Sequence, residues 1–398
     1  MRTLRRPPAL RPLLAIALLA LIVAAPTARA AFDTKARAAV VIDMTSGAVL
    51  LDKNGDISLP PASMSKLMTL NMVFEALQEG RLSMSETFRV SERAWRMGGS
   101  KMFLREGERV SVEDLVRGVV VQSGNDACVV LAEALAGSEE AFARRMNERA
   151  LELGMTGSHF TNSTGWPHPD HRMTAHDLMF LTERMITAFP EYYPYFAETE
   201  FAWDGVEQKN RNPLLYLDIG ADGLKTGHTE EAGYGLTGSA VRDGRRVAFV
   251  VTGLASAKER SVESERLLTW AFREFRTEKV ASAGQIVGEA AVWIGEEAAV
   301  PLTPAGDVMV TVPFGRIGEL TTTVRYEGPV EAPVAMGDRI GELVVEAPGM
   351  APVVAPLIAA ASVGKGGVVP RVTGALKMLL DDLAEGGEAA EAGDAAAE

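Results

Sequence analysis

Cysteine, histidine and aromatic residues are scarce in this sequence. Cys128 is the only cysteine among 398 residues, so no intramolecular disulfide can form. We expect Cys128 to be a small buried apolar group on a helix. The sequence has five histidines, and aromatic residues make up 6% of it.

A surplus of positive charge is also lacking. Acidic residues number 53 against 40 Lys and Arg, and the formal net charge is −13. Without residues 1–30, which hold five arginines and no acid, the charge is about −18. Nucleic acid is therefore a poor candidate partner, because phosphates are bound by basic surfaces.

The N-terminus has the three parts of a secretory signal peptide. Arginines precede an apolar run from Leu13 to Ala25, and small residues stand at Ala28 and Ala30. This pattern predicts a signal peptide over residues 1–30 that is cleaved after Ala30. The alternative is an uncleaved anchor, but the run is well short of the about 20 residues of a membrane span. We therefore expect an exported protein.

A chain of this length and apolar content is expected to form two domains. Residues 38–52 read as two short strands joined at Ser46-Gly47. Residues 63–78 predict a helix buried nearly all round. Three β-prone stretches occupy residues 233–254, and further helices are expected at 111–121, 126–136, 139–153, 174–187 and 261–275. Strands at both ends around a helical middle predict an α+β or α/β domain over residues 31–278.

The composition changes after about Lys279 to short alternating segments separated by turn residues. We expect a small antiparallel sandwich or barrel over residues 279–363. A glycine-rich joint begins at Gly364, and an apolar stripe at helical spacing follows in the segment 364–384. Residues 385–398 are rich in acid and lack basic residues, which predicts a solvated tail.

Three short motifs carry the candidate chemistry. In Ser63-Met64-Ser65-Lys66, the first and fourth residues share a helix face, so the lysine can reach the serine hydroxyl. Pro60 and Pro61 indicate that Ser63 lies at the helix N-terminus, where developing negative charge is favoured. Lys66 can act as a base only if burial or a second cation lowers its pKa from about 10.4.

The other two motifs are Ser123-Gly124-Asn125 and Lys225-Thr226-Gly227. Ser123 can pass a proton, and the Asn125 amide can hold a substrate carbonyl or the Lys66 ammonium, although such residues also serve as ordinary helix caps. On a sheet edge, Lys225 would supply the second cation, Thr226 a donor for a carboxylate and Gly227 a close backbone approach.

The order of these motifs is typical of penicillin-binding proteins and class A β-lactamases. The chain resembles the low-molecular-mass penicillin-binding proteins, specifically the D-alanyl-D-alanine carboxypeptidases. Segments that carry the resemblance are PASMSKLMT, GGSKMFLREGERV, SGNDACVVLAE, HFTNSTGWPHP, DGLKTGHTEEAGYGL and ESERLLTWAFREF. It implies a penicillin-binding, β-lactamase-like domain with an antiparallel sheet and a helical subdomain, followed by the small all-β domain.

The resemblance also implies a role for each motif residue. Ser63 would attack the bond between two D-alanines and form an acyl-enzyme, with Lys66 as base. Ser123 and Asn125 would relay protons and position substrate. Lys225 with Thr226 would bind the terminal carboxylate, with Gly227 beside them on the substrate-binding strand and Arg260 as a further anchor. The backbone amides of Ser63 and His228 would form the oxyanion hole.

This reading requires no cofactor and no metal. His168, His171 and His176 resemble the spacing of zinc ligands, but the first two lie beside prolines in a predicted loop. Thr174 with Asp177 is better interpreted as a helix cap. The implied partners are peptidoglycan pentapeptide stems, β-lactams as covalent inhibitors, and the periplasmic face of the inner membrane through the C-terminal helix.

Alternatives remain open at this point. A β-lactamase shares the motifs, but its deacylating glutamate in an E-x-x-x-N segment is not found between Asn125 and Lys225. An endopeptidase or transpeptidase of the same group has the same motifs. From another class, a penicillin sensor or wall-binding scaffold would keep the motifs without turnover. The C-terminal stripe departs from a typical anchor because it lacks Trp and Phe and precedes an acidic tail.

Overall fold

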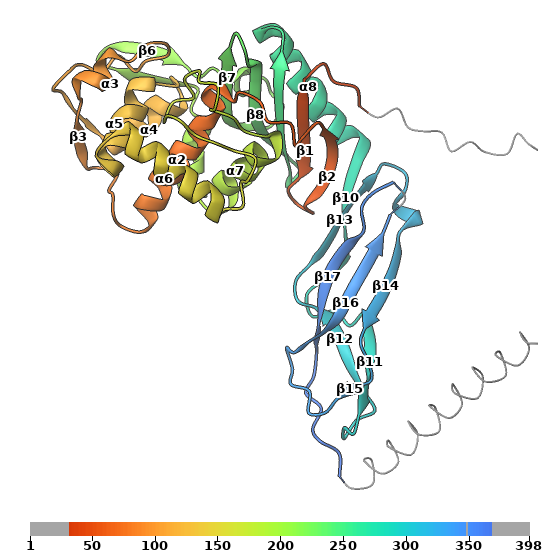
Figure 1. The fold of residues 1–398 in the computed structure, drawn as a ribbon. Helices are drawn as coiled ribbons and strands as arrows, with labels where there is room; N and C mark the ends of the chain where they lie inside the picture. The colour runs from red at the N-terminus through yellow and green to blue at the C-terminus, as the bar shows by residue number, and fades with distance from the viewer. Residues whose placement is uncertain (1–31, 348, 368–398) are drawn as a thin grey trace, which may run out of the picture.

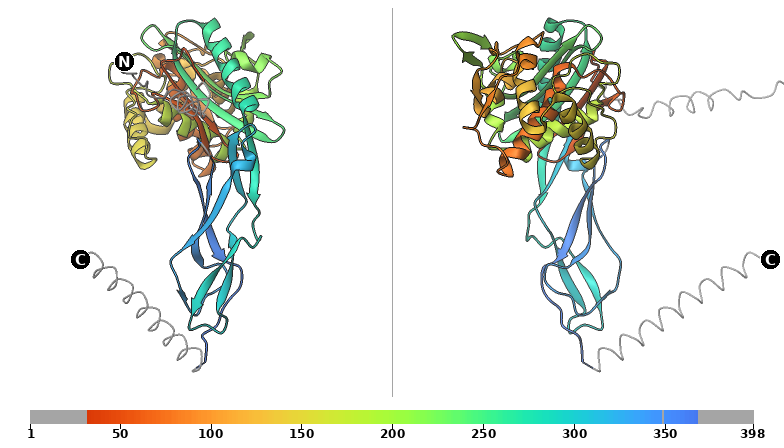
Figure 2. Two further views of the ribbon diagram at one scale, coloured as in Figure 1. Left: turned by 90° about the vertical axis from the view of Figure 1, so that its right-hand side faces the viewer. Right: turned by 60° about the vertical axis from the view of Figure 1, so that its left-hand side comes forward.

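The computed structural model describes residues 32–367 with the exception of 348. Figure 1 shows a mixed domain of strands and helices and, beneath it, an elongated domain made of strands; Figure 2 shows the same two parts from two further sides. The predicted signal peptide, residues 368–384 of the anchor helix predicted over 364–384, and the acidic tail lie outside the described residues; residues 364–367 are described and are not helical. Their boundaries stay predictions.

A five-stranded antiparallel sheet forms the centre of the first domain, in the order β2-β1-β9-β8-β7. Its strands are β1 (Ala38–Asp43), β2 (Ala48–Lys53), β7 (Ala221–Thr229), β8 (Gly233–Arg242) and β9 (Arg245–Leu254). The predicted hairpin at 38–52 is confirmed. The expectation of three strands in 233–254 is wrong: two ten-residue strands meet at Asp243-Gly244, where both residues have positive φ and close a tight turn.

Alternate residues of the central strands face opposite sides of the sheet, as the period of two requires. Ala248 and Val250 of β9 belong to the core shared with the helical lobe. Phe249 and Val251, next to them in sequence, pack against the helix on the other face. Two apolar cores thus sandwich one buried sheet, which gives the predicted α+β class.

The helices divide between these two faces (Figure 1). On one face lie α2 (Lys66–Gln78), α3 (Glu92–Arg96), α4 (Val112–Val120), α5 (Asn125–Ala136), α6 (Glu139–Glu152) and α7 (Ala175–Thr187); on the other lies α8 (Ala257–Glu274). The predicted helices are confirmed, but α8 begins four residues earlier than expected because Ser256 caps the amide of Glu259. Thr174 caps Asp177 as predicted. Cys128 is fully buried in α5, as expected.

Short elements complete the first domain. Two short antiparallel strand pairs join β3 (Thr87–Arg89) with β4 (Arg109–Ser111) and β5 (Glu200–Trp203) with β6 (Val206–Lys209). Single 3-10 turns are η1 (Ala62–Ser65), η2 (Tyr193–Ala197) and η3 (Pro213–Tyr216). Of these, η1 leads directly into α2 and matters most for the site.

The second domain is all β, as the alternating segments predict. β10 (Phe275–Ala281) pairs with β13 (Val308–Pro313), and the larger sheet has the order β14-β16-β17-β12-β11-β15. Its strands are β11 (Gly288–Trp293), β12 (Ala299–Pro304), β14 (Thr321–Tyr326), β15 (Val330–Glu331), β16 (Arg339–Glu346) and β17 (Val353–Ala359), and η4 (Ile317–Glu319) precedes β14. Inward-facing valines and leucines form its own core.

A buried carboxylate joins the two domains. Asp43, at the end of β1, is fully buried and forms an ion pair with Arg245 at 2.6 Å. The same oxygen accepts hydrogen bonds from Thr277 of β10 at 2.6 Å and Thr311 of β13 at 2.9 Å. Because this carboxylate accepts from strands of both domains, the contact links β1 to β10 and β13 where the β-rich domain attaches.

The far end of the β-rich domain holds part of the expected glycine joint. Gly364 accepts a backbone hydrogen bond from Glu296, and Gly366 donates one to Ile294.

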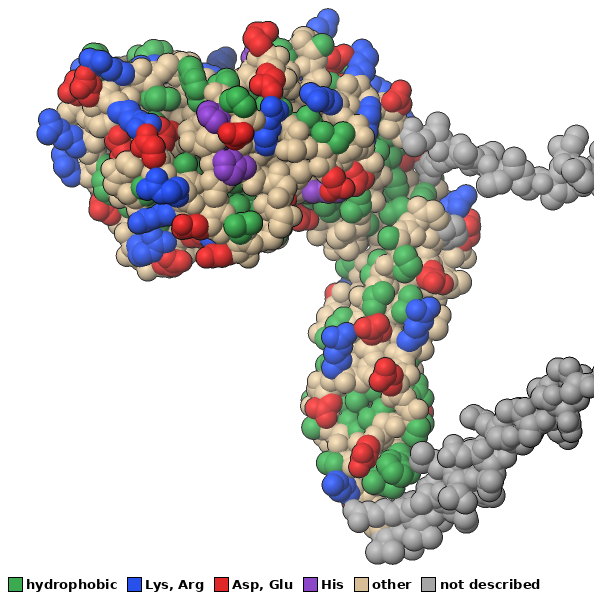
Figure 3. All heavy atoms as spheres, viewed as in Figure 1, with side chains coloured by type: hydrophobic (Ala, Val, Ile, Leu, Met, Phe, Trp, Pro, Cys, Tyr) green, Lys and Arg blue, Asp and Glu red, His purple; other side chains and the backbone are tan. Residues whose placement is uncertain are grey.

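Over the described residues no helix is long and apolar enough to cross a bilayer. Figure 3 shows acidic and basic side chains interspersed on the face in view, without a broad basic area.

Candidate active site

Ser63 lies half-buried in the η1 turn at the start of α2, as the proline pair predicts. Ala62 before it has a positive φ of 49°, a conformation that non-glycine residues seldom adopt and that clusters at functional sites. Two glycines press against this turn: a Cβ on Gly165 would lie 2.0 Å from the Ala62 carbonyl oxygen, and one on Gly227 would lie 2.8 Å from that of Pro61. Close packing thus holds Ser63 between a loop and strand β7.

Lys66 meets the serine as the one-turn spacing predicts. Its Nζ donates to Ser63 Oγ at 2.8 Å and to the Thr164 carbonyl at 2.6 Å. Complete burial lowers the pKa of Lys66 to about 8, and the guanidinium of Arg211 acts in the same direction. The condition for a lysine base is therefore met.

Ser123 and Lys225 approach the same place from the other motifs. Lys225 Nζ donates to Ser123 Oγ at 2.8 Å across 102 residues of sequence. Burial and the neighbouring Lys66 hold the pKa of Lys225 well below its usual value. Ser123 has a positive φ of 58°, which turns the chain just before α5. Two lysines and two serines thus lie in one cluster, in which Ser63 is half-buried and the other three are buried.

Asn125 supports a neighbouring loop and does not contact Lys66. Its Nδ2 donates to the Gly98 carbonyl at 2.8 Å, while the Lys66 ammonium takes Ser63 and Thr164 as acceptors. In this structure Asn125 is therefore not a hydrogen-bond partner of the Lys66 ammonium, and its alternative role toward a substrate carbonyl stays a prediction. Asp126, next in sequence, fastens the same loop by accepting the amides of Met102 and Leu104.

Two arginine side chains add positive charge near Ser63 and Ser123. Arg211 donates to Ser100 Oγ, and Arg260 lies with its guanidinium 5.8 Å from the ring of Tyr234. Burial lowers the pKa of both guanidinium groups, and neither forms an ion pair with an acidic side chain in the described ranges. Arg211 is exposed and Arg260 is half-buried, so an anion can reach both guanidinium groups, and this cluster suits a carboxylate.

The remaining predicted residues lie on β7, the edge strand of the sheet, as expected. Thr226 is buried and Gly227 makes the close approach to η1 described above. The ring of His228 is exposed and stacks on Tyr234 with centroids 3.8 Å apart. Because Gly227 packs against η1, the backbone of the next residue, His228, also lies close to Ser63.

The three candidate zinc histidines have different surroundings, although the His171 amide donates to the His168 carbonyl at 3.0 Å. Burial lowers the pKa of His171 to about 3, and its Nδ1 accepts from the Thr161 amide. His176 instead bonds to Asp52 and Asp56, each at 2.8 Å. Within the residues that the structure describes, no group of three or more His, Cys, Asp or Glu side chains is arranged to hold a metal ion.

This arrangement is suited to acyl transfer. A serine beside a lysine of lowered pKa can become a nucleophile, and a second serine bonded to a second lysine can return the proton. The family model described as D-alanyl-D-alanine carboxypeptidase matches residues 24–256. The chain belongs to this family. The C-terminal domain of penicillin-binding protein 5 matches residues 275–365.

Relatives of this D-alanyl-D-alanine carboxypeptidase extend over most of its length. D-alanyl-D-alanine carboxypeptidase DacC of Escherichia coli is 37% identical and covers 87% of this chain and 90% of its own. DacD of Salmonella typhimurium is 36% identical over 84% and 88%. Penicillin-binding protein 5 of Haemophilus influenzae is a structural neighbour with a TM-score of 0.78, 36% identity, and coverage of 84% and 98%. The predicted family, fold class and serine-type D-Ala-D-Ala carboxypeptidase activity are confirmed.

Several residues of this carboxypeptidase site were not identified from the sequence. Arg211, Thr164, Asp126 and Glu139 contact or influence the motif residues, yet none belongs to a motif. Arg211 and Thr164 lie in loops, where neither periodicity nor capping rules apply. Glu139 follows Ser138, the cap of α6, and reads from the sequence as an ordinary first-turn acid.

Proposed function

We propose that this enzyme removes the terminal D-alanine of peptidoglycan pentapeptide stems through an acyl-enzyme on Ser63. The observation that supports this assignment most is the contact of 2.8 Å between Ser63 Oγ and Lys66 Nζ, in a position where burial lowers the pKa of the lysine to about 8. At neutral pH roughly a tenth of such lysines would be uncharged and ready to accept a proton.

In the first step, the Ser63 hydroxyl gives its proton to neutral Lys66 as its oxygen attacks the carbonyl carbon of the penultimate D-alanine. The backbone amides of Ser63 and His228 stabilise the oxyanion. The C–N bond then breaks, and the leaving amine takes a proton passed from Lys66 through Ser123, whose Oγ is bonded to Lys225. Free D-alanine departs and an ester remains on Ser63.

In the second step, water attacks the ester while a neutral Lys66 accepts its proton. The C–O bond to Ser63 breaks, the serine oxygen regains a proton, and the shortened stem leaves as a carboxylate. β-Lactams acylate the same oxygen by opening their ring, which retains the leaving nitrogen in the adduct. A slow second step would make that adduct long-lived.

The positive charges of Lys225, Arg211 and Arg260 would favour a substrate that ends in a free carboxylate. Lys225 and Thr226 would bind the terminal carboxylate, and Arg211 and Arg260 would add positive charge around it. A carboxylate there would pair with two guanidinium groups whose pKa is lowered. The same contacts that bind the substrate would therefore select a free carboxyl end. Asn125, whose Nδ2 donates to the Gly98 carbonyl, would orient the substrate backbone.

The proposal is tested with a pentapeptide stem and its tetrapeptide product. We expect release of one D-alanine per stem, and a penicillin adduct on the peptide that contains Ser63 in a mass spectrum. Rapid hydrolysis of penicillin without an accumulating adduct would favour the β-lactamase alternative. Incorporation of an added acceptor amine, or cleavage of cross-linked stems, would instead show transpeptidase or endopeptidase activity.

The site of action is a further part of the proposal. We infer export by the N-terminal signal and action at the periplasmic face of the inner membrane, with the apolar stripe after Gly367 as a peripheral anchor. The support is in the sequence: Arg371 and Lys377 accompany a row of apolar residues at helical spacing.

Deleting residues 368–398 is expected to move the mature protein from the membrane fraction to the soluble fraction, because the apolar stripe is removed. Sedimentation with inner membranes followed by immunoblotting measures this. Removal of residues 385–398 alone is the control, and it should leave membrane binding intact, since only acidic tail is lost. A longer deletion that still sediments would show that another surface holds the protein.

A further inference from the structure

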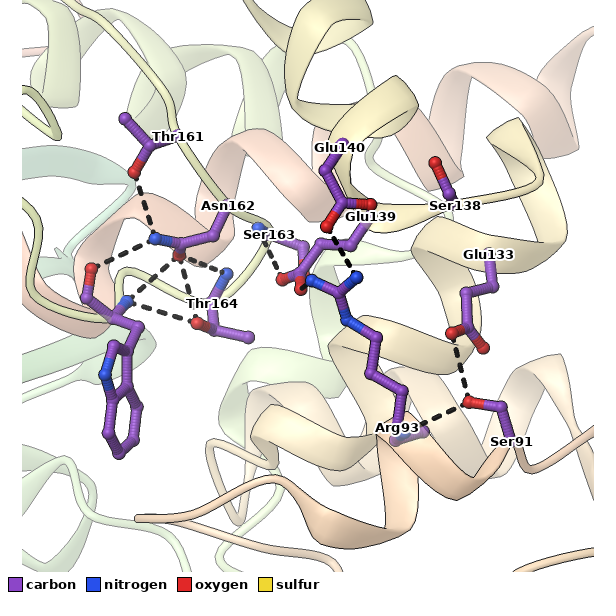
Figure 4. Close-up of polar contacts among 12 residues, drawn as sticks. Ser91, Arg93, Glu133, Ser138, Glu139, Glu140, Thr161, Asn162, Ser163 and Thr164 are labelled. Atoms are coloured by element: carbon purple, nitrogen blue, oxygen red, sulfur yellow. Dashed lines mark hydrogen bonds and ion pairs between the residues drawn. The ribbon is translucent and has the colours of Figure 1, made fainter.

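The segment that carries the Thr164 carbonyl is organised by the side chain of Asn162 (Figure 4). Asn162 Oδ1 accepts the backbone amides of Thr164 at 3.1 Å, Gly165 at 2.8 Å and Trp166 at 3.0 Å. A single side chain thus gathers three successive amides, which fixes a tight loop. This loop presents its carbonyl to Lys66.

Glu139 holds the same loop from the other side. This first residue of α6 is buried, and its Oε1 accepts from Ser163 N at 3.1 Å and Ser163 Oγ at 2.7 Å. The Ser163 carbonyl accepts from Thr69 Oγ1 of α2 at 2.6 Å, one helical turn after Lys66. Ser163 is therefore fixed between the carboxylate and the catalytic helix, directly before Thr164.

The other oxygen of Glu139 forms an ion pair that reaches the surface. Its Oε2 lies 2.7 Å from Arg93 Nη2, and Arg93 Nη1 lies 2.5 Å from Glu140 Oε1 (Figure 4). The Glu139 side chain is 5% exposed, whereas those of Arg93 and Glu140 are 46% and 59% exposed. Charge on Glu139 is therefore screened little by solvent, and charge on Glu140 is screened strongly.

We propose that Glu139 is a positioning residue for the general base: through Ser163 it holds the Thr164 carbonyl against Lys66, and it places a buried negative charge behind that contact. This inference rests on the proposed function, in which Lys66 must be neutral to act. Burial has the largest effect and lowers the pKa of Lys66, whereas the negative charges of Asp126 and Glu139 raise it. The Cys128 thiol is uncharged in the working range, because burial raises its pKa to about 12. Titratable groups that face Lys66 are Asp126 and Cys128 of α5, Glu139 of α6, Lys225 of β7, His171 and Arg211.

Glu139→Gln separates the effect of the negative charge on Lys66 from the hydrogen bonds that hold Ser163. The amide oxygen can still accept from Ser163, and the volume is unchanged, but the negative charge is lost. Lys66 should then lose its proton at lower pH, so the acidic limb of the acylation rate should move to lower pH by on the order of half a unit. The plateau rate should stay within about threefold, because the loop keeps its bonds.

Arg93→Gln should move the acidic limb of the acylation rate to higher pH. Without Arg93, the Glu139 charge is no longer offset, so Lys66 should hold its proton to higher pH. Glu140→Gln is the matched control: it alters the adjacent acid and the same arginine, but contacts no part of the Ser163 loop and is exposed. The pH profile of this control should coincide with that of the natural protein.

The measurement is the second-order rate of acylation by a β-lactam between roughly pH 5.5 and 9.5, with circular dichroism to check folding. Equal loss of rate at every pH in Glu139→Gln would overturn the inference, since a purely structural role predicts it. If that variant does not fold, an unshifted profile in Arg93→Gln overturns it instead. Failure of the natural protein to form an adduct on Ser63 would refute the proposed function itself, which keeps the two cases apart.

Discussion

Ser63→Ala is expected to abolish labelling by fluorescent penicillin and to reduce release of D-alanine from a pentapeptide by on the order of 10⁴-fold or more. The substitution removes the one oxygen that Lys66 contacts at 2.8 Å and that can form the ester. Because Ser63 is half-buried and loses only a hydroxyl, the cost to the free energy of unfolding should be about 1 kcal/mol. Gel fluorescence, a D-alanine assay and a thermal melt measure these three quantities.

Ser65→Ala is a matched control from the same turn. Ser65 is fully buried, and in the described part of the chain its hydroxyl has no hydrogen-bond partner. Its removal should therefore leave labelling and turnover close to those of the natural protein. Label that persists on Ser63→Ala, with its attachment site mapped by mass spectrometry, would identify a different nucleophile and refute the acyl-enzyme on Ser63.

Local patterns predicted the parts of this molecule whose structure depends on nearby residues. The burial of α2 follows from apolar residues around its circumference, and the contact of Ser63 with Lys66 follows from a spacing of one turn. The hairpin at Ser46-Gly47 and the cap at Thr174 are likewise local. For these elements the sequence within about ten residues determines the outcome.

Long-range contacts were predictable only where a motif order was known. Nothing near Ser123 indicates that its hydroxyl meets Lys225 across 102 residues, and only the resemblance to a family connected them. Arg211 belongs to the site because its charge lowers the pKa of both Lys66 and Lys225. Glu139 reads as a helix-capping acid, yet its carboxylate turns inward to Ser163. Such roles depend on how loops pack, which periodicity does not describe.

The order of strands was beyond sequence reasoning for a related cause. Each strand of the β-rich domain is indicated by its own alternation, but β12 lies between β11 and β17, which is far along the chain. Pairing is decided by which apolar faces fit together in one core, and many pairings of similar short strands bury similar area. The merging of 233–254 into two strands likewise depended on one turn at Asp243-Gly244.

Lys66→Met should lower the acylation rate by on the order of 10³-fold or more while leaving the protein folded. Methionine has a similar length and suits a fully buried position, but it cannot accept a proton. Removing a buried ammonium is favourable, whereas the Thr164 carbonyl loses its donor at a cost of about 1–3 kcal/mol, so the two effects largely cancel.

The pH profile distinguishes a lost base from a distorted site. The natural enzyme should acylate faster as pH rises through the pKa of Lys66 near 8, because only the neutral amine accepts the serine proton. Lys66→Met should lose this limb as well as the rate, so its residual acylation should not rise through the same range. Stopped-flow acylation and a thermal melt on the same sample measure both. A variant that keeps the limb with its midpoint near pH 8 would assign the base to another group, for which Lys225, bonded to Ser123, is the nearest candidate in the cluster.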